Sequence, residues 1–178
     1  MASAFGHAFA AYAIGSGFKK ESDLWKFNLL GIFCAVIPDA DVISFRFGVS
    51  YGDFWGHRGF THSICFAIFL AVLISTLFYF KDFLKPVFWK YVLFFSICSI
   101  SHGLLDMMTD GGMGVALFSP IDNTRYFLPW RPIEVSPMSA SRFFSSRGLD
   151  ILKSEFIWIG IPCVVYMLII KSFRKNKI

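Results

Sequence analysis

Long apolar stretches alternate with short polar connections along the chain. Residues 59–80 contain no Lys, Arg, Asp or Glu, and about 20 residues rising 1.5 Å each cover a hydrocarbon core of roughly 30 Å. Residues 86–105 form a second such stretch, interrupted only by Lys90 near one end, and residues 156–170 form a third. The pattern predicts a transmembrane helix at each of the three.

Two shorter apolar segments precede these stretches. Residues 1–18 are free of charge and rich in small residues, whereas residues 27–38 are too few for an ordinary span and are typical of a re-entrant or buried segment. We expect the two to form a hairpin that spans or dips into the bilayer and returns to its starting side. The prediction is an all-α integral membrane helical bundle of about four to five hydrophobic segments, one domain over residues 1–178.

One long connection is expected outside the membrane. Residues 109–155 include a stretch rich in Gly, Pro, Ser and aromatic residues, with no helical period and several proline breaks. We predict an ordered extramembrane loop. Its aromatic residues suit the lipid headgroup region, where amphipathic rings are enriched; these are Phe118, Tyr126, Phe127 and Trp130.

Composition supports a membrane protein and excludes other classes. The chain is 56% hydrophobic and 16% charged, against about 45–50% and about 25% in soluble domains. The net charge of +5 comes without a basic patch or a nucleic-acid reader motif, so no nucleic-acid partner is expected. The four cysteines lack the spacing of a metal site and are interpreted as small buried hydrophobes.

Basic residues divide between the two faces of the predicted bundle. Five segments with an outside N-terminus put ten of the seventeen on one face, which the positive-inside rule assigns to the cytoplasm. These ten are Lys19, Lys20, Lys26, Lys81, Lys85, Lys90, Lys171, Arg174, Lys175 and Lys177. The opposite face receives Arg46, Arg58, Arg125, Arg131, Arg142, Arg147 and Lys153. Because arginine binds phosphate and carboxylate in a planar fork, these arginines are expected to have a second role.

The chemistry is predicted to lie on that opposite face, where ionisable residues converge at segment ends. In Ser-His-Gly-Leu-Leu-Asp, the i,i+4 spacing places His102 and Asp106 on one helix face. Such groups are costly in apolar segments, which favours a shared metal site over seven separate structural roles. The candidate ligands are His7, Asp39, Asp41, His57, His62, His102 and Asp106. Taken singly, a capping or turn role is the alternative, and for His7 alone it is the favoured one.

Nitrogen and oxygen donors without thiolate suit zinc, with manganese or iron as alternatives. A catalytic zinc uses three protein ligands, so the candidate set is large enough for one or two ions, with Asp41 as a ligand or as an outer partner. A water activated by the metal would be the nucleophile. Arg58, Arg125 and Arg131 are candidate phosphate contacts, with headgroup binding or a salt bridge as an equal alternative.

Several motifs resemble a known family. These are His7, Pro38-Asp39-Ala40-Asp41, His57-Arg58-Gly59-Phe60-Thr61-His62-Ser63, His102-x-x-x-Asp106-x-x-Thr109-x-x-Gly112 and the segment 120–137. They resemble the YdjM-like, LexA-regulated membrane-bound metal-dependent hydrolases of bacteria. The resemblance covers roughly residues 5–137 and implies an inner-membrane hydrolase with metal at these His and Asp positions.

A fainter similarity is to zinc-dependent phospholipase C, which is all-helical. Its ligand order would correspond to His7, Asp39, His57 or His62, His102 and Asp106. No histidine follows His102, so the later ligands of that fold are missing and a three-metal centre is disfavoured.

We therefore predict a membrane-bound metal-dependent hydrolase that acts on a phosphoester in a lipid or lipid-linked substrate. Its site is expected to face the periplasmic side of a bacterial inner membrane. A metal-ion or proton transporter is one alternative, although a pathway needs polar groups through the whole bilayer depth. The other is a non-catalytic membrane protein whose metal holds the helices together.

Overall fold

The computed structural model describes residues 1–18, 24–144 and 146–175, and every regular element in these ranges is a helix. Two isolated β-bridges, Thr109 with Ile133 and Val115 with Tyr126, tie the long loop together. The predicted all-α class is confirmed. Of the basic residues placed above, Lys19, Lys20 and Lys177 lie outside the described residues.

The second segment is longer than expected. Helix α2 (Leu24–Val36) continues directly into the 3₁₀ helix η1 (Ile37–Phe47), and together they form a helix of 24 residues that is apolar enough to cross a membrane. The segment expected at 27–38 is therefore longer than predicted, and of the two alternatives, its length allows it to span the bilayer. Pro38 stands in the first turn of η1, where its missing N–H changes the hydrogen-bond pattern without ending the helix.

Helix α1 (Ala4–Ser16) precedes this element, and the Ser3 hydroxyl caps it by accepting the Gly6 N–H at 3.3 Å. Helix α3 (Ile64–Tyr79), extended by the 3₁₀ turn η3 (Phe80–Asp82), begins where the Ser63 hydroxyl accepts the Phe66 N–H. The short 3₁₀ helix η2 (Phe60–His62) comes before it. Helix α4 (Pro86–Met107) spans the second apolar stretch, with proline at its start as is favourable there.

The third apolar stretch belongs to a longer rod. Helix α6 (Ser146–Glu155), the π-helical turn η4 (Phe156–Gly160) and α7 (Ile161–Lys175) follow without interruption for 30 residues. Residues 146–155, expected to belong to the loop, are thus helical, as is the short α5 (Ala140–Phe143). In the described ranges four helices are long and apolar enough to cross a membrane, which confirms a membrane bundle.

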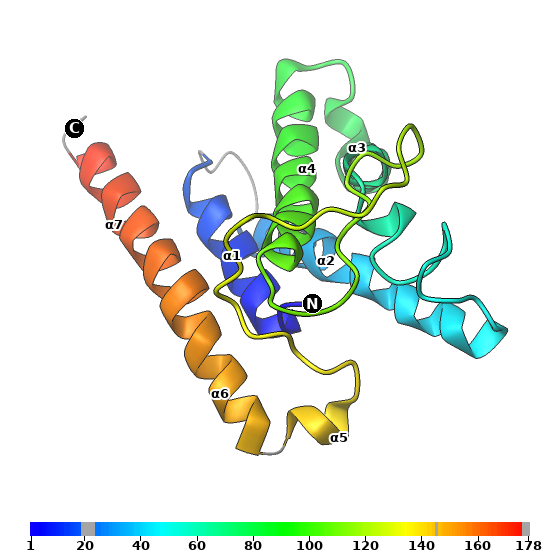
Figure 1. Cartoon of the computed structure of the whole chain (residues 1–178). Coiled ribbons are helices and arrows are strands. Elements are labelled where there is room, and N and C mark those ends of the chain that lie inside the picture. The colour runs from blue at the N-terminus through cyan, green and yellow to red at the C-terminus, as the bar shows by residue number, and fades with distance from the viewer. Residues whose placement is uncertain (19–23, 145, 176–178) are drawn as a thin grey trace.

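Helices α1 to α4 share a core of aromatic side chains. Phe94 and Phe95 of α4 are fully buried, and the rings of Phe27 and Phe94 stack with their centroids 3.9 Å apart. The rod lies beside α1 at the edge of the bundle (Figure 1), and none of its residues 161–175 is buried. Its apolar surface is therefore left to the surrounding bilayer.

Lys26 and Arg174 mark one end of the bundle. The Lys26 ammonium donates to the Phe78 carbonyl at 3.2 Å, and the Arg174 guanidinium donates to the Phe18 carbonyl at 2.8 Å. These contacts bring the start of α2 and the ends of α1, α3 and α7 to the same end. The opposite end holds the start of α1, the end of α4 and the segment before α3.

Candidate metal centre

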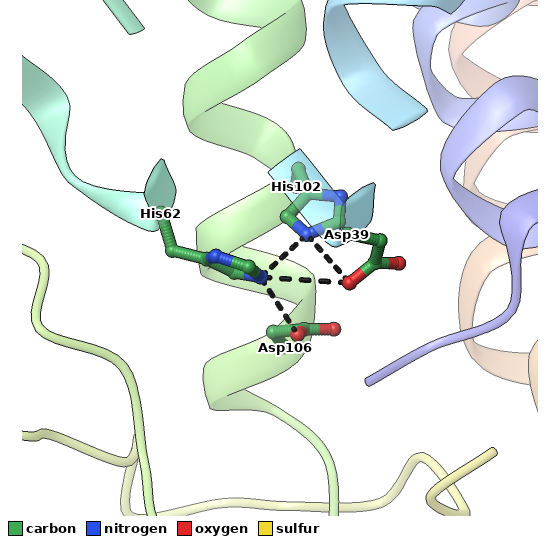
Figure 2. Close-up of side chains that lie close together, drawn as sticks. All are labelled: Asp39, His62, His102 and Asp106. Atoms are coloured by element: carbon green, nitrogen blue, oxygen red, sulfur yellow. Dashed lines mark hydrogen bonds and ion pairs between the residues drawn. The ribbon is translucent and has the colours of Figure 1, made fainter. Parts of the chain in front are cut away.

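Four buried donors meet at that opposite end. Asp39 comes from η1, His62 from η2, and His102 and Asp106 from the last turns of α4, and Figure 2 shows the four side chains pointing toward one another. We call these four residues the inner cluster. Each offers one ligand atom, and all of these atoms lie within 4.8 Å of one another.

The spacing of the donors fits a metal ion. The two Nε2 atoms of His62 and His102 are 2.9 Å apart, and they lie 3.5 and 3.4 Å from Asp39 Oδ1. A tetrahedral ion with bonds of about 2.0–2.1 Å keeps its ligand atoms about 3.3 Å apart. The inner cluster therefore has both the chemistry and the size of a site for a divalent ion.

Asp39 gives the strongest indication that the inner cluster binds a cation. Its side chain is buried, and neither carboxylate oxygen has a hydrogen-bond partner among the residues that the structure describes. A buried carboxylate is costly unless it is paired or bound to a cation. Its only close polar neighbours in the inner cluster are imidazole nitrogens, so a cation would satisfy it.

The proton on His102 is fixed by a backbone carbonyl. His102 Nδ1 donates to the Ala35 carbonyl at 2.7 Å, which leaves the lone pair of Nε2 directed at the inner cluster. In a regular α-helix this carbonyl would accept from the N–H of Asp39, four residues on. In the 3₁₀ geometry that begins at Ile37 the donor would be residue 38, but Pro38 has no N–H, so the carbonyl is open to His102.

Asp41 has the corresponding effect on His62. Asp41 Oδ2 lies 3.2 Å from His62 Nδ1, and Thr61 Oγ1 lies 3.1 Å from the same nitrogen. The other ring nitrogen of His62 is thereby free to face the inner cluster. Burial lowers the pKa of His62, but the nearby carboxylates of Asp39 and Asp41 outweigh this and raise the pKa to about 9. The surroundings thus stabilise positive charge at this point.

Both oxygens of Asp41 already accept hydrogen bonds. Its Oδ1 accepts from His57 Nδ1 at 2.7 Å, and its Oδ2 accepts from Thr61 Oγ1 at 2.7 Å and from the Arg58 N–H at 3.2 Å. Asp41, His57 and His62 also form a second group with metal-binding potential, but these hydrogen bonds account for its geometry. We call Asp41, His57 and Thr61 the outer group. Burial lowers the pKa of His57.

His7 borders the inner cluster from α1. Its ring stacks on that of His102 with centroids 3.8 Å apart, and its Nε2 lies 3.4 Å from Asp106 Oδ1. Neither ring nitrogen has a hydrogen-bond partner within the described ranges. The structure therefore brings His7 to the site, at the edge of the four donors.

Arg58 is an anchor for Asp106. Its Nε lies 3.0 Å from Asp106 Oδ2, while Nη1 donates to the Gly111 carbonyl and Nη2 to Thr109 Oγ1, each at 2.9 Å. Gly112, with φ of +94°, passes so close that a Cβ there would lie 2.6 Å from Nη1. The guanidinium is fully buried, both Nη atoms donate hydrogen bonds and Nε lies in the ion pair with Asp106, so the geometry favours a salt bridge over a phosphate contact.

The other two candidate arginines lie outside the inner cluster. Arg125 donates to the carbonyls of His57 and Tyr51, each at 2.8 Å, and so joins the long loop to the segment before α3. Arg131 is exposed, and its guanidinium lies 4.7 Å from the centre of the Phe127 ring. Of the two, Arg131 is the more exposed to solvent or to a headgroup.

Sequence reasoning missed some contributors. The Ala2 N–H donates to Asp106 Oδ1 at 2.7 Å, and the buried Glu155 carboxylate accepts from the N–H and the hydroxyl of Ser3. The first residues of the chain thus join Asp106 to α6. One signal could have identified Glu155, because it directly precedes the apolar stretch 156–170, where a carboxylate is costly. No sequence signal indicates a role for the Ala2 N–H.

Comparisons with known proteins give a family and no activity. The family described as YdjM inner membrane protein matches residues 1–178. The chain is also 37% identical over 161 residues to the protein described as Inner membrane protein YbcI of Escherichia coli (strain K12). That alignment covers 90% of this chain and 92% of the relative. No solved structure matches the chain significantly.

Proposed function

The chain belongs to the YdjM family of inner membrane proteins and is a multi-pass protein of that membrane, and from this premise we propose that it is a metal-dependent hydrolase. The substrate we propose is a phosphoester in a lipid or lipid-linked molecule. One observation carries the proposal. A buried carboxylate without hydrogen bonds, Asp39, faces two imidazole nitrogens at distances that suit a shared ion.

Zinc is the ion that we favour for the inner cluster, because two imidazoles and two carboxylates without thiolate suit it. A divalent ion bound there would supply a Lewis acid and lower the pKa of a water. The protein holds the donors in place. The Ala35 carbonyl and Asp41 orient the two histidines, while Arg58 and the Ala2 N–H fix the two oxygens of Asp106.

The location of the inner cluster supports a lipid substrate. It lies at the end of the bundle opposite to Lys26 and Arg174, which by the positive-inside rule is the periplasmic end. The long loop follows α4 in the sequence. Its exposed aromatic side chains, such as Phe118 and Trp130, suit the lipid headgroup region. We assign Arg131 as the candidate headgroup contact and Arg58 as a positioning residue.

The proposal is tested by measuring the metal content of the protein together with its turnover of phosphoester substrates. Detergent-purified protein is analysed by inductively coupled plasma mass spectrometry and assayed with bis(p-nitrophenyl) phosphate and with long-chain phospholipids. We expect about one ion per chain and turnover that a chelator abolishes and zinc restores. Asp39→Asn should lose both, whereas Asp122→Asn, in the exposed loop, should keep both. Wild-type protein that binds no zinc or manganese would overturn the proposal.

A structural ion is the second candidate, and one observation favours it. All four donors of the inner cluster are buried, and four protein ligands complete a structural zinc site. The two functions differ in access of water to the ion. Manganese-loaded protein should enhance the relaxation rate of water protons if one position is open. No enhancement, together with a stoichiometric ion and no turnover, would establish the structural role.

A further inference from the structure

A narrow groove separates α1 from the rod of α6, η4 and α7. Its volume is about 350 Å³, and its lining is apolar, with Phe5 and Phe9 on one side and Leu152, Phe156, Ile159 and Val164 on the other. Glu155 is the one charged residue among the lining residues. The groove therefore suits a long hydrocarbon group with a polar end.

The groove is long enough for an extended hydrocarbon chain. The rod residues that line it run from Leu152 to Val164, about 18 Å at 1.5 Å per residue. An extended alkyl chain can lie along that length.

The surroundings of the groove supply such a chain. The rod is one of the helices of membrane-crossing length, and none of residues 161–175 is buried. The rod residues next to the groove are thus in contact with bilayer hydrocarbon. An apolar groove left unfilled would lose dispersion contacts along its walls, so a lipid chain is its favoured content.

The polar end of the groove leads to the inner cluster. The Glu155 carboxylate there accepts a hydrogen bond from the Ser3 hydroxyl at 2.5 Å, and the preceding residue, Ala2, donates its N–H to Asp106. Gly6, which also lines the groove, directly precedes His7. In Figure 1 the N-terminus accordingly lies close to the lower end of α4. A lipid with its chain in the groove would place its headgroup end near the inner cluster.

We propose that this groove, lined by Phe5, Phe9, Leu152, Phe156 and Val164, binds one long acyl chain of the lipid substrate. The substrate class is then a long-chain lipid, and this assignment of the chain to a substrate rests on the hydrolase function proposed above. Binding of the chain itself does not depend on catalysis. The groove and the reaction can therefore be tested separately.

The experiment is photolabelling in vesicles. Full-length protein is reconstituted with a phospholipid whose acyl chain carries a diazirine, and labelled residues are mapped by mass spectrometry after irradiation. Val164→Trp fills the groove, and Val165→Trp is the matched control. The neighbouring valines are similarly exposed, at 41% and 49%, but only Val164 lines the groove. Leu152→Trp fills the groove from its other end and replaces Val164→Trp if that variant does not fold.

We expect labelling of Phe9 and Phe156 at least fivefold above that of outward residues such as Leu168. Val164→Trp should reduce this labelling at least fivefold, and Val165→Trp should leave it unchanged. Equal labelling of groove and outward residues, or equal effects of the two variants, would overturn the proposal. No turnover is measured in this experiment. A negative result for the groove can therefore be told apart from a negative result for the hydrolase proposal, because the metal and turnover assays test the hydrolase proposal separately.

Discussion

Asp39 and Asp41 stand two residues apart in one 3₁₀ helix, yet their surroundings are opposite. Asp41 accepts hydrogen bonds from His57, Thr61 and the Arg58 N–H, whereas neither oxygen of Asp39 has a hydrogen bond from any described residue. The outer group is thus complete without an ion, and the inner cluster is not. Residue type alone does not separate the two carboxylates, and it is the lack of hydrogen bonds at Asp39 that makes it the proposed ligand.

The largest expected effect comes from removing the Asp39 carboxylate, which lacks hydrogen-bond partners among the described residues. Asp39→Ala should weaken zinc binding more than about 100-fold, beyond the range typical of outer partners, because a donor of the ion itself is lost. Competition titration with a chromophoric chelator measures this. Zinc affinity that stays within tenfold of wild type would show that Asp39 is not a ligand.

Asp41→Asn should have the next largest effect. The amide keeps the shape of the side chain but loses the charge that orients His62, so zinc affinity should fall about 10- to 100-fold without being abolished. The same titration applies. A loss as complete as that of Asp39→Ala would move Asp41 from the outer group to the ligands.

Thr61→Val should have a smaller effect. It removes the hydroxyl that donates to Asp41 at 2.7 Å and keeps the shape of the side chain. A hydrogen bond to a charged group is worth about 1.5–3 kcal/mol, but His57 and the Arg58 N–H still hold Asp41. We expect zinc affinity to fall by less than about tenfold, and an unchanged affinity would exclude Thr61 from the support of the site.

Arg131→Ala should have the smallest effect on the ion. The exposed guanidinium lies over Phe127, away from the inner cluster, so zinc affinity should stay within about twofold. Turnover of phospholipid in vesicles should nevertheless fall, because the proposed headgroup contact is lost. If metal binding falls instead, Arg131 supports the site through the long loop.

Most residues of the candidate site could be predicted from the sequence, but the different roles of Asp39 and Asp41 could not. The i,i+4 spacing of His102 and Asp106 depends only on helix geometry, and it correctly placed both side chains on one face. The separation of Asp39 from Asp41, in contrast, depends on which residues of distant segments reach each carboxylate. Spacing along the chain does not contain that information.

The prediction of the fold from the sequence had the same limit. Charge-free stretches correctly located α3 and α4, because the need to match the bilayer acts on local composition. The extension of the second segment to Phe47 and of the rod back to Ser146 was missed. Both extensions contain charged residues, and composition alone assigned them to loops. For Arg58 the sequence left a phosphate contact and a salt bridge as equal alternatives, because its partner, Asp106, is 48 positions away in the sequence.

The hydrogen bond from Ala2 to Asp106 has a consequence for biogenesis. It joins the beginning of the chain to the end of α4, and Ser3 is in turn held by Glu155, which reaches the ribosome exit only after α1 to α5 have emerged. Contacts so distant in sequence form late, after most of the chain has been synthesised. A metal ion at this site would then be captured late, and a product truncated before α6 would lack the Glu155 contact that holds the first residues beside Asp106.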